Sequence, residues 1–93
     1  MQWQGAHVVV TGGSSGIGLA VARGAAGRGA RVTLIARGVE RLDAAAAGLR
    51  AEGHRGAIGA IAVDVADREA ITVALARAEV ERGPVEALVC SAG

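Results

Sequence analysis

Glycines recur near the start of the chain at a spacing that suits the binding of a pyrophosphate. Thr11-Gly12-Gly13-Ser14-Ser15-Gly16-Ile17-Gly18 follows a run of three valines, and a helical pattern begins directly after it. Glycine lets the backbone turn tightly and approach a phosphate without an intervening Cβ, and a helix start offers unpaired N–H groups and a positive dipole end. No acid lies between Thr11 and Gly18. The stretch predicts a dinucleotide-binding turn, for which the alternative is a tight strand-to-helix turn without a ligand.

A second group of residues concerns which dinucleotide is preferred. A site selective for NAD places an acid about 20 residues after the glycines, where it binds the ribose hydroxyls, but that strand-end position here is Ala36. Without the acid nothing repels a 2′-phosphate, and Arg37 supplies a charged, planar set of donors. Arg41 lies one helical turn later and can add to the contact. The pattern predicts NADP(H); the alternative for each arginine is an exposed surface charge.

The composition of the chain argues against several other classes of function. The chain has 93 residues and a net charge of +1, which indicates one small domain and argues against nucleic-acid binding. A single cysteine, Cys90, excludes an intrachain disulfide and suits a reducing, cytoplasmic location. We expect no signal peptide, no membrane span and no metal site. His7 is expected to be a structural residue of the first strand.

The elements that position these residues alternate along the chain. Strands are expected at 6–11, 31–36, 57–63 and 85–90, and helices at 17–28, 39–52 and, capped by Asp67, up to 82. This order predicts an α/β fold with a doubly wound parallel sheet, strand order 3-2-1-4, and a ligand crevice between strands one and four. The helix faces expected to be buried comprise Ile17, Val21, Gly24, Ala25; Val39, Leu42, Ala46, Leu49; and Ile71, Leu75, Ala78.

Four motifs in sequence resemble the short-chain dehydrogenase/reductase family over essentially the whole chain. They are the glycine stretch, Ala36-Arg37, Asp64-Val65 and Cys90-Ser91-Ala92-Gly93. The resemblance implies a Rossmann-type fold in which Ser14 and Ser15 bind cofactor phosphates, Asp64 accepts a bond from the adenine amino group, and Ala92 and Gly93 let the backbone approach the adenosine. The serines could instead be turn formers, and Asp64 could cap the next segment. Cys90 and Ser91 replace the family's usual asparagines, and Cys90 is expected to be a small buried residue.

The catalytic part of the family pattern is missing. Family members use a Tyr acid, a Lys and a Ser, whereas this chain contains no Tyr and no Lys, so no catalytic residue is expected here. We therefore expect the cofactor-binding half of an NADP(H)-dependent oxidoreductase acting on a ketone or an alcohol, cut at the end of the fourth strand. Within the family the segments are most similar to the 3-ketodihydrosphingosine reductases, and the parent protein is expected to be a homo-oligomer. The alternatives are a non-catalytic dinucleotide-binding module and an inactive truncated remnant.

Overall fold

The computed structural model describes residues 2–12, 14, 16–54 and 58–91. In these ranges four strands alternate with three helices, which are β1 (His7–Thr11), α1 (Gly16–Gly27), β2 (Arg31–Ala36), α2 (Val39–Ala51), β3 (Ile58–Ala62), α3 (Arg68–Arg82) and β4 (Ala87–Cys90). The predicted order is confirmed, with shorter third and fourth strands. β4 begins two residues later than expected because its pairing with β1 starts only at Val8 and Ala87. Ala57, the expected start of the third strand, lies outside the described residues.

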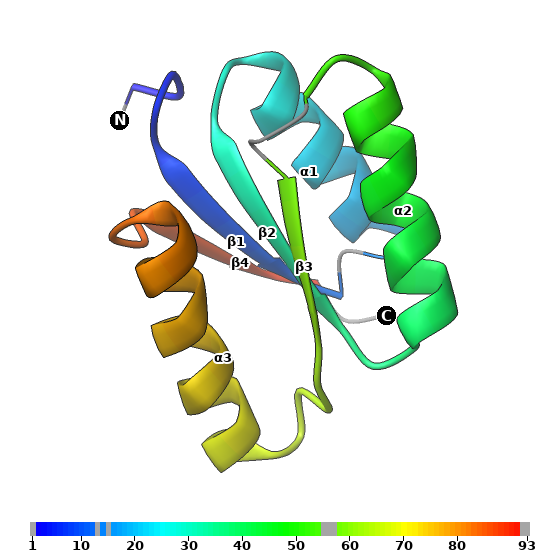
Figure 1. The fold of residues 1–93 in the computed structure, drawn as a ribbon, viewed down its shortest axis with the longest axis vertical. Helices are drawn as coiled ribbons and strands as arrows, with labels where there is room; N and C mark the ends of the chain where they lie inside the picture. The colour runs from blue at the N-terminus through cyan, green and yellow to red at the C-terminus, as the bar shows by residue number, and fades with distance from the viewer. Residues whose placement is uncertain (1, 13, 15, 55–57, 92–93) are drawn as a thin grey trace.

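The sheet is parallel and has the predicted order β3-β2-β1-β4. Figure 1 shows α1 and α2 on one face of the sheet and α3 on the other. This change of face is what right-handed crossovers require when the chain steps from β1 out to β3 and then returns to the far side of β1. Thr11 pairs with both Ile35 and Cys90, so the carboxyl ends of the three strands meet at one edge.

The core consists of two layers of unequal size. The valines of β1 are completely buried because both faces of the strand are covered. Val8 and Val10 pack with the apolar faces of α1 and α2, while Val9 packs with Ile35, Ile61 and two alanines of α3. The buried α1 residues in the larger layer are alanines, which let the helix approach the sheet closely. The α3 layer is the smaller of the two.

The expected helix faces need correction at the helix ends. Ile17 is 79% exposed and Val39 is 56% exposed, because each lies in the first turn of its helix, next to the edge where the strands end. Gly24 is also exposed and Val21 only half-buried, and the buried residues of α1 are Gly18, Ala22, Ala25 and Ala26. In α2, Leu42, Ala46 and Leu49 are buried as expected, together with Ala45.

On the opposite face the coverage is incomplete. Ala74 and Ala78 are the buried residues of α3, whereas Ile71 and Leu75, expected on the buried face, are half-buried. Leu88 is 49% exposed, and Cys90, expected to be buried, is exposed. Both side chains extend from β4 on the face that carries α3, and α3 packs over the other strands instead. The prediction for Cys90 was therefore wrong because it assumed a covering layer at β4.

Two polar residues fix the ends of elements as the sequence indicates. His7 is completely buried; its Nδ1 donates to the carbonyl of Gly83 at 2.8 Å, and its Nε2 lies 2.8 Å from the Thr33 hydroxyl. The carbonyl can only accept, so Nδ1 carries a proton. Asp67 caps α3 by accepting from the backbone N–H of Ala70 at 3.1 Å. In the described part of the chain, none of the helices has the length and apolar content that a membrane crossing demands.

Candidate cofactor site

A cavity of about 800 Å³ lies where the carboxyl ends of the strands meet. Three segments form most of its wall, namely the turn after β1, the start of α2 and the turn after β3. The lining residues are Gly12, Ser14, Ala36, Arg37, Gly38, Val39, Glu40, Arg41, Asp64, Val65, Ala66 and Ser91. The cavity thus occupies the edge of the sheet where the strand order reverses, which is the expected ligand position in a doubly wound fold.

Backbone hydrogen bonds hold the turn after β1 between its neighbours. Gly12 N donates to Ile35 O at 2.8 Å, and Ser91 N donates to Thr11 O at 3.0 Å. Gly12 has a φ of +73°, and a Cβ at this position would lie 2.5 Å from the carbonyl oxygen of Ser91. Gly12 is therefore required by the close approach of the β4 end as well as by its own backbone conformation.

Gly16 has a different environment. Its φ is +59°, but among the described residues a Cβ at this position would meet nothing within 4 Å. α1 starts at this residue and has no acid in its first turn, and the first N–H groups of a helix have no partner within it. The open space in front of a positive helix end fits a phosphate group.

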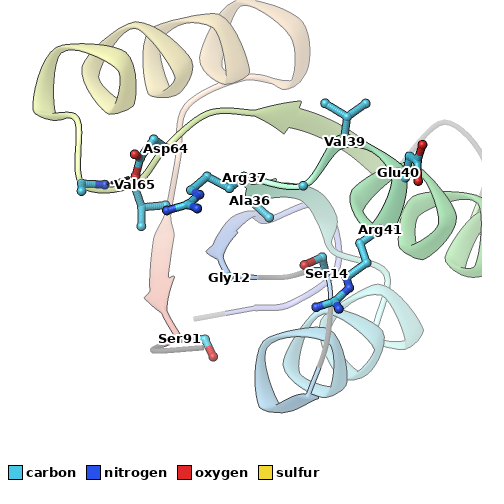
Figure 2. A pocket seen from close by; sticks show the side chains of 12 residues that line it. Gly12, Ser14, Ala36, Arg37, Val39, Glu40, Arg41, Asp64, Val65 and Ser91 are labelled. Atoms are coloured by element: carbon cyan, nitrogen blue, oxygen red, sulfur yellow. Dashed lines mark hydrogen bonds between the residues drawn. The ribbon is translucent and has the colours of Figure 1, made fainter.

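Two arginines bring positive charge to the cavity, Arg37 from the loop between β2 and α2 and Arg41 from the first turn of α2. Figure 2 shows Arg37 pointing toward Asp64 and Val65, and Arg41 pointing toward Ser14. In the described ranges, neither guanidinium forms an ion pair, whereas the salt bridges found there use Arg23, Arg77 and Arg82. Two guanidinium groups that share a cavity without a carboxylate partner fit an anionic ligand.

Asp64 takes part in the turn that follows β3. Its Oδ1 accepts from Ala66 N at 2.9 Å, and its carbonyl accepts from Asp67 N at 3.0 Å. The alternative role for Asp64, organising the next segment, is therefore present. The same side chain lines the cavity beside Val65, which is 51% exposed. One turn can thus order the loop and present a carboxylate to a ligand.

The structure brings together six of the predicted site residues as cavity lining: Gly12, Ser14, Arg37, Arg41, Asp64 and Val65. Thr11 is nearly buried, and its hydroxyl donates to the carbonyl of Val89 at 3.4 Å. Gly16, Ile17 and Gly18 form the first turn of α1 outside the lining. The other three, Ser15, Ala92 and Gly93, lie outside the described residues.

Several lining residues were not among the predicted ones. They are Ala36, Gly38, Val39, Glu40, Ala66 and Ser91. Most of them neighbour a predicted residue in sequence, so treating each strand end as a segment of several residues would have found them. Glu40 brings an acid to the lining, but its side chain points away from Arg41 in Figure 2.

Comparison with known proteins finds one family and relatives that are dehydrogenases or reductases. The family model described as short chain dehydrogenase matches residues 6–93. The chain is 42% identical over 89 residues to gluconate 5-dehydrogenase of Gluconobacter oxydans, covering 96% of this chain and 34% of that protein. It is 39% identical over 88 residues to a 3-dehydrosphinganine reductase of Arabidopsis thaliana, covering 94% and 25%.

A solved structure shows the same likeness in three dimensions. The crystal structure of L-sorbose reductase from Gluconobacter frateurii, complexed with NADPH and L-sorbose, aligns with a TM-score of 0.88 and 41% identity, covering 100% of this chain and 36% of that one. The chain therefore spans between a quarter and just over a third of the length of these relatives.

Proposed function

This chain belongs to the short-chain dehydrogenase family, and we propose that it forms the NADP(H)-binding part of an oxidoreductase that reduces a ketone or oxidises an alcohol. The observation that carries the proposal is the pair Arg37 and Arg41, whose guanidinium groups face one cavity without a carboxylate partner in the described ranges. When bound, NADP(H) supplies or accepts the hydride. The residues described here bind and orient it.

Each part of the site has a separate role in this proposal. The open space at Gly16 and the unpaired N–H groups at the start of α1 receive the pyrophosphate. Asp64 holds the adenine amino group with a carboxylate oxygen, while Oδ1 keeps its bond to Ala66. Ala36, in the lining at the end of β2, leaves room for a 2′-phosphate and carries no charge that would repel it.

Preference for NADP(H) can be tested by restoring the missing acid. Ala36→Asp should lower the affinity for NADP⁺ relative to NAD⁺ by about ten- to a hundredfold, because a carboxylate at the end of β2 repels the 2′-phosphate and accepts bonds from free ribose hydroxyls. Calorimetric titration of the unaltered chain and the variant with both dinucleotides measures this ratio. Ala36→Ser is the control, since it adds a polar atom without charge. Equal affinities of the unaltered chain for both dinucleotides would contradict the proposed preference.

For the substrate we propose a carbonyl or alcohol compound, with a 3-ketosphinganine as the first to test. Support comes from the 39% identity to 3-dehydrosphinganine reductase, while the 42% identity to gluconate 5-dehydrogenase makes a sugar acid the comparison substrate. The cavity lining described above serves the cofactor. The substrate test therefore uses a protein that contains this chain together with the catalytic Tyr and Lys, with both compounds compared by kcat/KM.

We further propose that residues 1–93 act as one portion of a longer Rossmann domain, in a protein that forms a homo-oligomer. The support is the absence of Tyr and Lys, combined with a span of 25% to 36% of the relatives' lengths. Sequencing the coding region downstream provides the test. An in-frame Tyr-x-x-x-Lys supports the enzyme, and a stop codon directly after Gly93 supports a non-catalytic binding module.

A further inference from the structure

We propose that the outward side of α3 is an interface at which two copies of this chain associate about a two-fold axis. The two helices are antiparallel, with Val73 of each copy at the axis, and Glu69 of each copy meets Arg77 of the other. The inference rests on the proposed homo-oligomer, for which it names the surface, and it does not depend on cofactor binding.

The outward side of α3 has an exposed apolar residue between two hollows. Val73 is 67% exposed. On one side it lines a hollow of about 420 Å³ that residues 61–63, at the end of β3, close from beneath. On the other side it lines a hollow of about 350 Å³ together with Thr72. Of the helices that the structure describes, α3 alone lies on this face of the sheet (Figure 1). A protruding valine between two hollows fits a second helix, because helices pack by placing the ridges of one into the grooves of the other.

The charges beside Val73 determine which helix fits. Glu69 lies four residues before Val73 and Arg77 four residues after it, so the three side chains form one row along α3. The two charged residues are eight positions apart, beyond the spacing of three or four at which side chains of one helix pair. An antiparallel copy with Val73 on the two-fold axis places each glutamate opposite the other copy's arginine. The row is therefore complementary to itself, as an interface between identical surfaces requires.

Both charged groups have binding capacity for a partner. Arg77 donates from Nε to Glu81 at 3.1 Å, and a guanidinium group has further donors on its two terminal nitrogens. Glu69 takes part in none of the ion pairs found in the described ranges. Packed helices lie about 8–10 Å apart, a separation that glutamate and arginine side chains beside the contact can span. Each copy thus supplies one apolar contact and two halves of ion pairs.

Charge reversal tests the interface, with the dissociation constant of the dimer measured by sedimentation equilibrium at low ionic strength. The 93-residue chain is used with Cys90→Ser in every protein, which excludes a disulfide between copies. Glu69→Arg and Arg77→Glu should each raise the dissociation constant about ten- to a hundredfold, because two attractive pairs become two repulsive ones. An equimolar mixture of these two variants should dimerise again, since every ion pair of the mixed dimer then joins a cation to an anion.

The matched control is a second pair of reversals with the same net charges. Arg23→Glu and Glu52→Arg alter an exposed salt bridge between α1 and the end of α2, on the other face of the sheet. Each should leave the dissociation constant unchanged, and their mixture should dimerise no better than either alone. A gain in the control mixture equal to that of the α3 mixture would show attraction by net charge alone and overturn the interface.

Other surfaces of association are separated by further variants. Val73→Ser should weaken the dimer, whereas a dimer that persists in Val73→Ser and is lost in Leu88→Ser forms through the exposed residues of β4 and overturns the inference. Circular dichroism checks each fold, and Glu69→Gln and Arg77→Gln replace a reversal variant that does not fold. A monomer up to about 1 mM, near the weak limit of specific binding, also overturns the inference. Titration of the same sample with NADP⁺ tests the proposed cofactor binding separately.

Discussion

Gly12 and Gly16 both have positive φ angles, but different constraints keep them as glycines. Gly12 touches the end of β4, where a Cβ would lie 2.5 Å from the Ser91 carbonyl oxygen. At Gly16, the first residue of α1, a Cβ would meet nothing within 4 Å among the residues that the structure describes. The close approach of β4 therefore constrains Gly12, whereas the backbone conformation at the helix start constrains Gly16, and the proposed function adds the binding of a phosphate there.

This difference predicts separable effects of the same substitution. Gly12→Ala should lower the free energy of unfolding by more than Gly16→Ala, whose cost is about 1–2 kcal/mol for an alanine with positive φ. Gly16→Ala should also lower the affinity for NADP⁺, because its methyl group occupies the space in front of the helix. This loss of binding free energy should be larger than the loss in the free energy of unfolding. Urea unfolding and calorimetric titration of the two variants check the two halves of the prediction. Equal losses of stability would show that the Ser91 contact does not constrain Gly12.

At the scale of single residues, the sequence predicted which residue types line the site but not how they are oriented. Arg37, Arg41, Ser14 and Asp64 all line one cavity, because the carboxyl ends of parallel strands must share an edge. The divergence of the two guanidinium groups depends on side-chain rotamers and on the loop after β3, which spacing along the chain does not encode. The exposed Cys90 was likewise missed, since its environment depends on a covering layer rather than on its own type.

At the scale of elements, α3 and β3 are joined by a contact that the sequence pattern did not reveal. Gly59 interrupts the apolar run of β3. In the structure a Cβ at Gly59 would collide with the guanidinium group of Arg82, from the last turn of α3. The Arg82 side chain is only 17% exposed and donates to Glu81 at 2.8 Å. The glycine provides the space in which this arginine lies on the sheet.

The contact predicts that the effect of Gly59→Ala on the free energy of unfolding changes sign when the Arg82 side chain is removed. Gly59→Ala alone should destabilise the fold by about 1 kcal/mol, because the added methyl group displaces the Arg82 guanidinium. In an Arg82→Ala background the same substitution should stabilise the fold by about 0.5–1 kcal/mol, since alanine is better than glycine in a strand once space is available. Urea unfolding of the four proteins gives the coupling energy. Gly48→Ala is the control, at an exposed α2 position where a Cβ meets nothing within 4 Å. Additive effects of the two changes would mean that Arg82 does not occupy the space above Gly59.

The periodicity of apolar residues predicted the types and the order of the elements correctly. It predicted only some of the residues that each helix buries. Leu42, Ala46 and Leu49 are buried as expected, because they lie in the middle of α2 over the sheet. Ile17 and Val39 fit the same spacing, yet they are exposed because each begins its helix beside the strand ends. Periodicity gives the direction of a side chain around the helix axis, and it does not tell how far the sheet extends along that axis.

At the scale of the whole molecule, topology was the most predictable property. Right-handed crossovers and the reversal after β3 leave strand order 3-2-1-4 as the arrangement that places α3 alone on one face, and the structure has that order. The two faces are unequally covered, since Leu88 and Cys90 remain exposed on the α3 side. The cavity lies at the carboxyl ends of the strands, and the chain contains no Tyr and no Lys.

The last prediction is that the purified 93-residue chain binds NADP(H) but shows no reductase or dehydrogenase turnover. Hydride transfer to a ketone needs a proton donor near the carbonyl whose pKa is close to the working pH. The chain has no Tyr and no Lys. His7 is buried in bonds to Gly83 and Thr33 at the amino ends of the strands, and His54 follows α2 at the same end. Both histidines therefore lie away from the cavity at the carboxyl ends.

The assay combines NADPH with a panel of ketones, and protein free of host reductases is essential because a trace of contaminating enzyme would mimic activity. Gly16→Ala, purified in the same way, is the matched control, since contaminant activity persists in it and activity of the chain does not. We expect the same background rate for both proteins. Turnover that is present in the unaltered chain and disappears in Gly16→Ala would show that a proton donor for the reaction lies within these residues, and the argument from the missing Tyr and Lys would then fail.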